Sequence, residues 1–247
     1  MRSAPARFLA ALRRNLVLVA SLATVALYAF AARPLHLRPE VGAVICAPLS
    51  LLLAGILLRR LRFDRTTTAL LLGGLVLYFL YLGYTTPGER NYDGGDQLKY
   101  LKYIAEKHEI PPAKHCFICH HPPLYYVVAA GAYQFFQVTK CAPNPLGVQL
   151  FSLAIFFAFL VYGVLFVRLF ASHRRVVHIA TALLVFWPYS VHNSVRVHND
   201  TLAAAVVAAG MDYAARWYRE ERPRHLYLAA LCGALGILTK STAYVLV

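Results

Sequence analysis

The chain has 247 residues, of which 59% are hydrophobic and only 15% are charged, and its mean hydropathy is +0.53. A soluble domain of this length does not need so much apolar surface, so the composition favours a protein that crosses a membrane several times. The net charge of +14 does not indicate nucleic acid as a partner, because Lys and Arg occur in short clusters between apolar runs, as they do at the ends of membrane helices.

Several apolar stretches are candidate membrane spans, because a helix of about 20 apolar residues crosses the hydrocarbon core. In chain order they lie at about 15–32, 41–58, 66–84, 146–167, 176–191, 199–215 and 226–247. The last three are short or interrupted, two of them by Asp212 and Lys240. The first ends in Ala29-Phe30-Ala31, which also resembles the cleavage site of a signal peptide, but both interpretations put residue 33 outside.

The run at 122–138 decides the predicted topology. If it spans the membrane, the basic clusters at 168–175 and 216–224 face outside, against the preference of Lys and Arg for the cytoplasmic side. If it lies on the outer surface, those two clusters and the ones at 2–14 and 59–65 all face the cytoplasm. The run is short, aromatic and opened by two prolines, which suits an interfacial helix. We therefore expect an all-α membrane protein with about seven transmembrane helices and a cytoplasmic N-terminus.

The large outer loop, at about 85–145, contains a second predicted surface helix at 96–108. One face of this helix is apolar, and the charged side chains lie largely on the other face. The apolar face consists of Leu98, Leu101, Ile104 and Ala105. Tyr100 and Tyr103 are expected at the level of the lipid headgroups. The prediction is therefore a pair of amphipathic surface helices on the outer side.

Many ionisable side chains fall on this outer side. The loop holds Glu89, Asp93, Asp96, Glu106 and Glu109, and the outer side also has His36, His108, His115, His120, His121, His192 and His198. The turn before the sixth span adds Arg196 and Asp200. Such a group suits acid–base chemistry on an anionic amphiphile. The competing interpretation is a solvated loop with scattered charges.

Two acidic segments carry the candidate carboxylates. In Asn91-Tyr92-Asp93-Gly94-Gly95-Asp96, the two glycines let the backbone turn sharply before the surface helix. Asp96 is placed to cap that helix, which leaves Asp93 free for chemistry. Asp200 has two interpretations that stay open, a role in binding and simple capping of the sixth span.

The cysteines allow several interpretations. Cys46 and Cys232 lie in spans and are expected to pack as small apolar residues. The segment Cys116-Phe117-Ile118-Cys119-His120 matches the C-x-x-C-H pattern of covalent haem attachment, and with His115 it also has ligand types for a metal. We favour a disulfide that closes the outer loop, from Cys116 or Cys119 to Cys141, in an oxidising compartment. Free thiols are the remaining alternative.

Four short motifs follow one another in the chain. They are Tyr92-Asp93-Gly94-Gly95-Asp96-Gln97, His121-Pro122-Pro123-Leu124-Tyr125-Tyr126, His198-Asn199-Asp200-Thr201-Leu202 and Gly236-Ile237-Leu238-Thr239-Lys240. In this order and spacing they resemble the polytopic GT-C glycosyltransferases that use lipid-linked sugars, especially the protein O-mannosyltransferase and aminoarabinose-transferase group (glycosyltransferase family 39 and relatives). The resemblance covers about 66–247, and 1–65 adds two N-terminal spans.

This resemblance implies membrane helices with surface helices in the first outer loop. It also implies transfer of a sugar from a polyprenyl-phosphate-linked donor to a lipid, glycan or protein acceptor, on the outer face of a bacterial inner membrane. In such families the first Asp of the acidic motif is the catalytic base, which is Asp93 here, and Asp96 is the second catalytic candidate. The family often has Asp-Glu at this point where the chain has Asp93-Gly94, so a second carboxylate is missing.

The carrier phosphate leaves as an anion and needs cations nearby. Arg196, His121 and Lys240 are the candidates, and Asp200 is a further candidate for substrate binding. Lys240 lies within an apolar span, where a bare ammonium is costly, so we expect it to face a cavity or a partner. The alternative is a structural pairing of Lys240 with Asp200 or Asp212. The scheme requires no metal and no other cofactor.

The chain stops at Val247 inside an apolar run, where enzymes of this group continue with more spans. We expect either a fragment or a partner chain that supplies the remaining helices. The same residues leave two alternative functions open. One is a non-catalytic membrane subunit or transporter derived from the same fold, and the other is a membrane haem or redox protein.

Overall fold

The computed structural model describes residue 44 and residues 47–91, 94–139 and 142–246. The predicted first span, the candidate base Asp93 and the cysteine Cys141 lie outside these residues. All regular structure in the described residues is helical and none is a strand, which confirms the predicted all-α class. The chain forms two compact units, residues 1–84 and residues 85–247. The compact units divide after Tyr84, and the division at residue 65 expected from the resemblance stays a prediction.

The described part of unit 1 is a pair of contacting helices, α3 (Ala47–Arg60) and α4 (Arg65–Tyr84). Asp64 ends the short turn between them. Its Oδ1 accepts hydrogen bonds from the backbone N–H groups of Thr66 and Thr67, at 3.0 and 3.1 Å, and its Oδ2 accepts one from the Thr67 hydroxyl. This carboxylate satisfies amide groups that the first turn of α4 leaves without partners.

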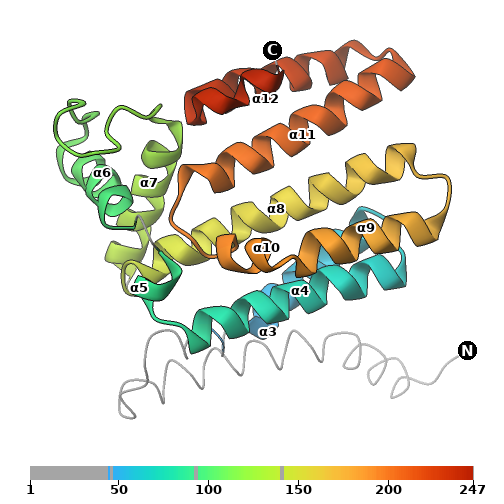
Figure 1. The fold of residues 1–247 in the computed structure, drawn as a ribbon, viewed down its shortest axis with the longest axis horizontal. Coiled ribbons are helices and arrows are strands. Elements are labelled where there is room, and N and C mark those ends of the chain that lie inside the picture. The colour runs from blue at the N-terminus through green and yellow to red at the C-terminus, as the bar shows by residue number, and fades with distance from the viewer. Residues whose placement is uncertain (1–43, 45–46, 92–93, 140–141, 247) are drawn as a thin grey trace, which may run out of the picture. The chain divides into compact units, whose positions relative to one another are not determined.

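Four long helices run side by side in unit 2, and neighbours in the chain point in opposite directions (Figure 1). They are α8 (Leu146–Phe170), α9 (Arg174–Phe186), α11 (Asn199–Glu220) and α12 (Pro223–Thr239). Their order across the unit is α12, α11, α8 and α9. The short helix η1 (Ser241–Leu246) follows α12. The turns after α8 and after α11 therefore lie at one end of the unit.

The predicted span at 176–191 is wrong as a single helix. The structure breaks it at Trp187 into α9 and the short helix α10 (Pro188–Asn193). Pro188 has no N–H to donate and disfavours a helical conformation in the residue before it, and Trp187 is not helical, with ψ at 129°. The break brings α10 beside the turn that leads into α11.

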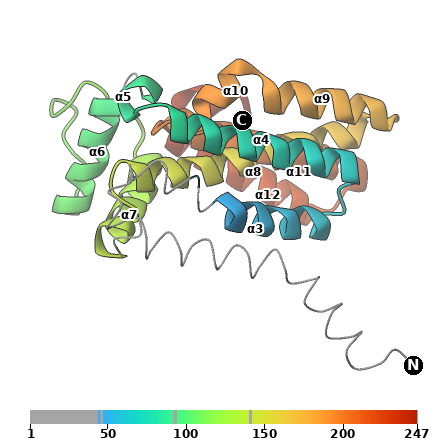
Figure 2. The same cartoon turned by 90° about the horizontal axis from the view of Figure 1, so that it is seen from below.

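The outer loop folds into α5 (Pro87–Arg90), α6 (Gly94–Lys107) and α7 (Leu124–Thr139). Both views show α6 and α7 running across one end of the four long helices rather than alongside them (Figures 1 and 2). α7 contacts α8, α11 and α12. The run at 122–138 therefore does not add a further helix to the row of long helices. The predicted topology likewise leaves this run out of the spans.

The surface between α6 and α7 is an apolar core. Leu101, Ile104 and Ala105 of α6 are buried in it and Leu98 packs against it, so the predicted apolar face is confirmed. The placement of Tyr100 at the headgroup level is wrong. Tyr100 is fully buried and stacks on the Tyr126 ring, with their centroids 3.9 Å apart.

Two features bear on a membrane. Among the described residues, α4 and α8 are long and apolar enough to cross a bilayer, whereas the sequence predicts about seven such helices. The turns after α8 and α11 and the helix ends that adjoin them, which we call the basic end of unit 2, carry seven arginines, Arg168, Arg174, Arg175, Arg216, Arg219, Arg222 and Arg224. The Arg219 guanidinium donates to the backbone oxygen of Leu169 and so links the two turns. The basic end and the α6–α7 pair therefore occupy opposite ends of unit 2 (Figure 1).

Candidate functional site

The start of α11 is built by its histidine. His198 is the N-cap, in an extended backbone conformation, and its Nδ1 accepts a hydrogen bond from the Asp200 backbone N–H at 3.1 Å. Asn199 donates from its amide to the backbone oxygen of Thr239 at 3.4 Å, which ties the start of α11 to the end of α12. The capping role considered for Asp200 is therefore wrong, because His198 fills it and the carboxylate of Asp200 is left for other contacts.

Asp200 and Lys240 form an ion pair across the ends of α11 and α12. The second oxygen of Asp200 lies 3.1 Å from Nδ1 of His198. A neutral His198 ring uses that nitrogen as a cap, and a protonated ring would instead pair it with the carboxylate. Asp212 is bonded by Arg216 at 2.7 and 3.0 Å. Of the two structural partners considered for Lys240, the structure therefore selects Asp200.

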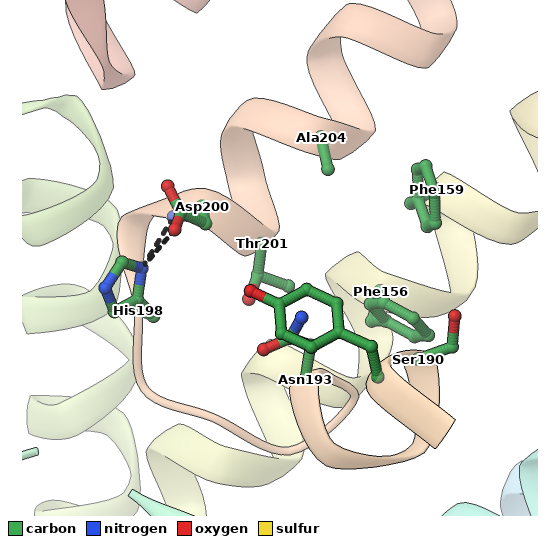
Figure 3. A pocket seen from close by; sticks show the side chains of 9 residues that line it. Phe156, Phe159, Ser190, Asn193, His198, Asp200, Thr201 and Ala204 are labelled. Atoms are coloured by element: carbon green, nitrogen blue, oxygen red, sulfur yellow. Dashed lines mark hydrogen bonds and ion pairs between the residues drawn. The ribbon is translucent and has the colours of Figure 1, made fainter. Parts of the chain in front are cut away.

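A cavity of about 300 Å³ is lined on one side by His198 and Asp200 (Figure 3). Its lining comes from α8, α10, α11 and the residue before α11, namely Phe156, Phe159, Tyr189, Ser190, Asn193, His198, Asp200, Thr201 and Ala204. Figure 3 shows His198 and Asp200 on one side and the rings of Phe156 and Phe159 on the other. One wall is therefore apolar, and the opposite wall carries ionisable groups.

His121 stands just before α7 and interacts electrostatically with Lys240, His198 and Asp200. Burial lowers the pKa of its imidazole below the ordinary value, and electrostatic interactions with His120, Lys240 and His198 lower that pKa further, while Asp200 opposes them. The ring is consequently neutral at neutral pH. The expectation that His121 supplies a standing positive charge is not supported by this environment, although a neutral ring still donates a hydrogen bond.

The two tyrosines of the His121–Tyr126 motif hold α7 in place. Tyr126 donates to the side-chain oxygen of Gln97 at 2.9 Å, and the hydroxyls of Tyr125 and Ser152 lie 3.4 Å apart. Both tyrosines are completely buried. Each therefore joins α7 to another element, Tyr126 to α6 and Tyr125 to α8. Sequence reasoning assigned no role to either, although an aromatic pair next to a candidate binding histidine is a usable signal.

The segment before the candidate base is fastened to the turn before α11. Oδ1 of Asn91 accepts the backbone N–H of Val197 at 3.1 Å. The preceding residue, Arg90, is fully buried and donates to the backbone oxygen of Thr85 and, at 3.1 Å, to Gln149 Oε1. A methyl group on Gly94 would lie 2.4 Å from the Asn91 amide, so only glycine fits there without a rearrangement. The bond from Val197 places Asn91, two residues before Asp93, beside the turn that leads into α11.

Asp96 and Arg196 are not among the residues that line the cavity. Asp96 is the third residue of α6 and pairs with Lys99 at 3.3 Å, so the prediction that it caps the helix is wrong. A carboxylate in the first turn is still favourable there, because the helix N-terminus is positive. Arg196 donates to the side-chain oxygen of Asn193 at 3.2 Å, and Asn193 lines the cavity.

The outer cysteines pair differently from the favoured prediction. Cys116 and Cys119 form a disulfide with each other, which closes a four-residue turn and does not join the loop to Cys141. With their sulfurs bonded together, neither is a thiol that can add to a haem or ligate a metal. Within the described residues, no three His, Cys, Asp or Glu side chains gather as a metal site would require.

Comparison of the chain with protein-family models, with curated proteins and with solved structures finds no match.

Proposed function

We propose that the chain transfers a sugar from a polyprenyl-phosphate-linked donor to an acceptor, with inversion at the anomeric carbon. The reaction takes place at the end of unit 2 that carries α6 and α7. One observation carries this proposal: His198 and Asp200 line a cavity whose opposite wall is aromatic, Asp200 is paired with Lys240, and His121 interacts electrostatically with all three. A polyprenyl phosphate has the same two parts, an anion and an apolar chain.

In this mechanism Lys240 supplies the positive charge for the carrier phosphate. Its ammonium is paired with Asp200 at rest, so an incoming phosphate competes with that carboxylate for it. His121, neutral at rest, donates a hydrogen bond to the phosphate or takes up a proton as the anion approaches. The surrounding low-polarity wall strengthens these interactions relative to water.

The bond changes are those of a single displacement. The acceptor hydroxyl attacks the anomeric carbon, its proton passes to the Asp93 carboxylate, and the carbon–oxygen bond to the carrier phosphate breaks. Asp93 is assigned this role by its place in the acidic motif. The bond from Asn91 to Val197 supports the assignment, since it holds the flank of that motif beside the His198 turn. No metal takes part in this scheme.

The proposal includes an inner-membrane topology with about seven spans and a cytoplasmic N-terminus. Two observations support it. Large apolar side chains are exposed along α9 and α12, where water would be a poor solvent for them; they include Val176, Ile179, Leu183, Leu228 and Leu231. The two basic turns lie at the end of unit 2 opposite α6 and α7, as a cytoplasmic placement requires.

Binding of polyprenyl phosphate, the part shared by all such donors, tests the proposed site. We expect Lys240→Met to weaken binding about tenfold or more, because a charge-assisted phosphate contact contributes about 1.5–3 kcal/mol. Lys102→Met, which removes an exposed lysine from α6, should leave the affinity unchanged. The measurement is a titration of the full chain in detergent micelles with polyprenyl phosphate. Equal affinities for the wild type and Lys240→Met would contradict the proposed site.

A further inference from the structure

The basic end of unit 2 combines charge and aromatic surface in a way that the transfer reaction does not use. Residues 168–175 contain three arginines and residues 212–225 contain four, against three acids, Asp212, Glu220 and Glu221, which leaves a net charge of 7 − 3 = +4. Four aromatic side chains, Phe170, Trp217, Tyr218 and Tyr227, are exposed on the same two turns and the adjoining helix ends. Arginine and exposed Trp and Tyr together are typical of the headgroup level of a membrane.

Several of these arginines are already engaged within the protein. Arg216 holds Asp212, Arg222 lies 3.4 Å from Glu220, and Arg219 links the two turns through the Leu169 oxygen. Arg174, Arg175 and Arg224 are exposed and come from both turns. Because Arg219 links the ends of α8 and α11, the three exposed guanidinium groups belong to the same end of the unit.

The apolar neighbours of this surface determine what it fits. On α9, Val176 and Ile179 are exposed immediately after Arg174 and Arg175. On α12, Leu228 and Leu231 are exposed after Arg224. A ligand on this surface therefore meets positive charge with exposed aromatic and aliphatic side chains beside it. A phospholipid has the matching parts, an anionic headgroup and acyl chains.

We propose that the basic end of unit 2 is a selective binding surface for anionic phospholipids, with the exposed arginines of both turns on the headgroup phosphates. The inference rests on the membrane placement in the proposed function but not on the transfer reaction. Each Lys or Arg near an anionic membrane surface adds about 1 kcal/mol of attraction, so three exposed arginines are enough for a measurable preference among lipids.

The two tryptophans of the chain allow a direct test, because they report on different places. Trp217 is in the last turn of α11, at the basic end, and Trp187 is at the break between α9 and α10. Both are exposed, at 40% and 60%. The full chain, with Trp187→Phe, is reconstituted in vesicles of phosphatidylcholine with increasing fractions of brominated phosphatidylglycerol or brominated phosphatidylcholine. Quenching of Trp217 then gives the relative affinity of the two lipids at the basic end.

We expect phosphatidylglycerol to quench Trp217 with a relative affinity at least threefold above that of phosphatidylcholine. The preference should disappear in Arg174→Gln/Arg175→Gln/Arg224→Gln and fall in high salt, which screens these charges. The matched control removes three exposed lysines near α6, as Lys102→Gln/Lys107→Gln/Lys114→Gln, and should keep the preference. Trp187, studied in Trp217→Phe, should show no preference.

Two results would overturn the inference. Equal quenching of Trp217 by both lipids would mean that the basic end has no lipid selectivity. In that case, efficient quenching by brominated phosphatidylcholine would still support the membrane insertion on which the proposed function depends. An undiminished preference in the triple arginine variant would also overturn it, because the charges responsible would then lie elsewhere. If brominated phosphatidylcholine quenches neither tryptophan, the membrane placement itself fails.

Discussion

At the scale of single residues, the account depends on how His198, Asp200, Lys240 and His121 share protons and charge. The ion pair of Asp200 with Lys240 solves the problem of an ammonium in an apolar segment. The paired residues are 47% and 24% exposed, so the pair is accessible to an anionic ligand and contributes modestly to stability. The resting site is thus neutralised by its own residues until a stronger anion arrives.

His121 gives a pH dependence with a definite sign. Its folded-state pKa is lowered, chiefly by burial, so below about pH 6.5 the unfolded chain binds this proton more readily than the folded one. The contribution to stability is therefore intact above that pH and is lost as the pH falls toward the folded-state pKa. We expect His121→Gln to lose less stability than the wild type between pH 7 and pH 5, measured by unfolding in mixed detergent micelles. Identical losses in the two proteins would mean that His121 titrates normally.

Residue types predict this site only in part. The pairing of Lys240 with Asp200 was one of the sequence alternatives because an intramembrane lysine needs a partner. The cap by His198 was not among the alternatives, because helix N-caps are usually expected at Ser, Thr, Asp or Asn. Contacts such as Asn91 to Val197 join residues that are 106 positions apart, and no local pattern reports them.

At the scale of elements, the α6–α7 pair forms the end of unit 2 next to the site. Periodicity predicted the apolar face of α6 correctly, because one buried face of a helix repeats every three to four residues. It misplaced Tyr100, because an amphipathic aromatic ring suits a membrane interface and a protein core equally well. The break between α9 and α10 was missed because the apolar character of the run continues through Pro188, and hydropathy does not detect a missing hydrogen bond.

Two glycines test how closely α7 and α8 pack. A methyl group at Gly147, in α8, would lie 2.4–2.7 Å from the Phe136 side chain, so Gly147→Ala should destabilise the protein by about 1–3 kcal/mol. Gly131, within α7, has nothing within 4 Å, so Gly131→Ala should stabilise it by about 0.5–1 kcal/mol through helix propensity. Unfolding of both variants in mixed micelles measures whether each substitution lowers or raises the free energy of unfolding. Destabilisation by both substitutions would contradict the packing described here.

At the scale of the whole molecule, the proposed topology depends on one observation: the basic end and the α6–α7 pair lie at opposite ends of unit 2. Charge clusters in the sequence predicted which turns belong together, because the preference of arginine for one side acts on whole loops. The number of spans is harder to read. α9 has only 13 residues and is therefore about 20 Å long, whereas the hydrocarbon core is about 30 Å thick. Its apolar composition alone thus suggests a longer membrane helix than the structure has.

Cysteine labelling tests that topology. In a background with Cys46, Cys141 and Cys232 replaced by serine, we expect Lys107→Cys to react with a membrane-impermeant maleimide added to intact cells. Arg174→Cys, at the basic end, should react only after the cells are permeabilised. Labelling of both positions from one side would contradict the proposed orientation, because the two lie at opposite ends of unit 2.

The central claim is the displacement of a sugar from its carrier, and carrier release measures it most directly. Membranes that contain the full chain are supplied with polyprenyl-phosphate-linked hexose and pentose donors, and free polyprenyl phosphate is quantified over time. We predict that the wild type and the control variant Lys102→Met both release polyprenyl phosphate from one of these donors. The rate should fall about 100-fold or more in Asp93→Asn, which lacks the proposed general base. All three proteins should be present in the membrane at normal levels. Release that persists in Asp93→Asn, or none by the wild type from either class of donor, would contradict the account.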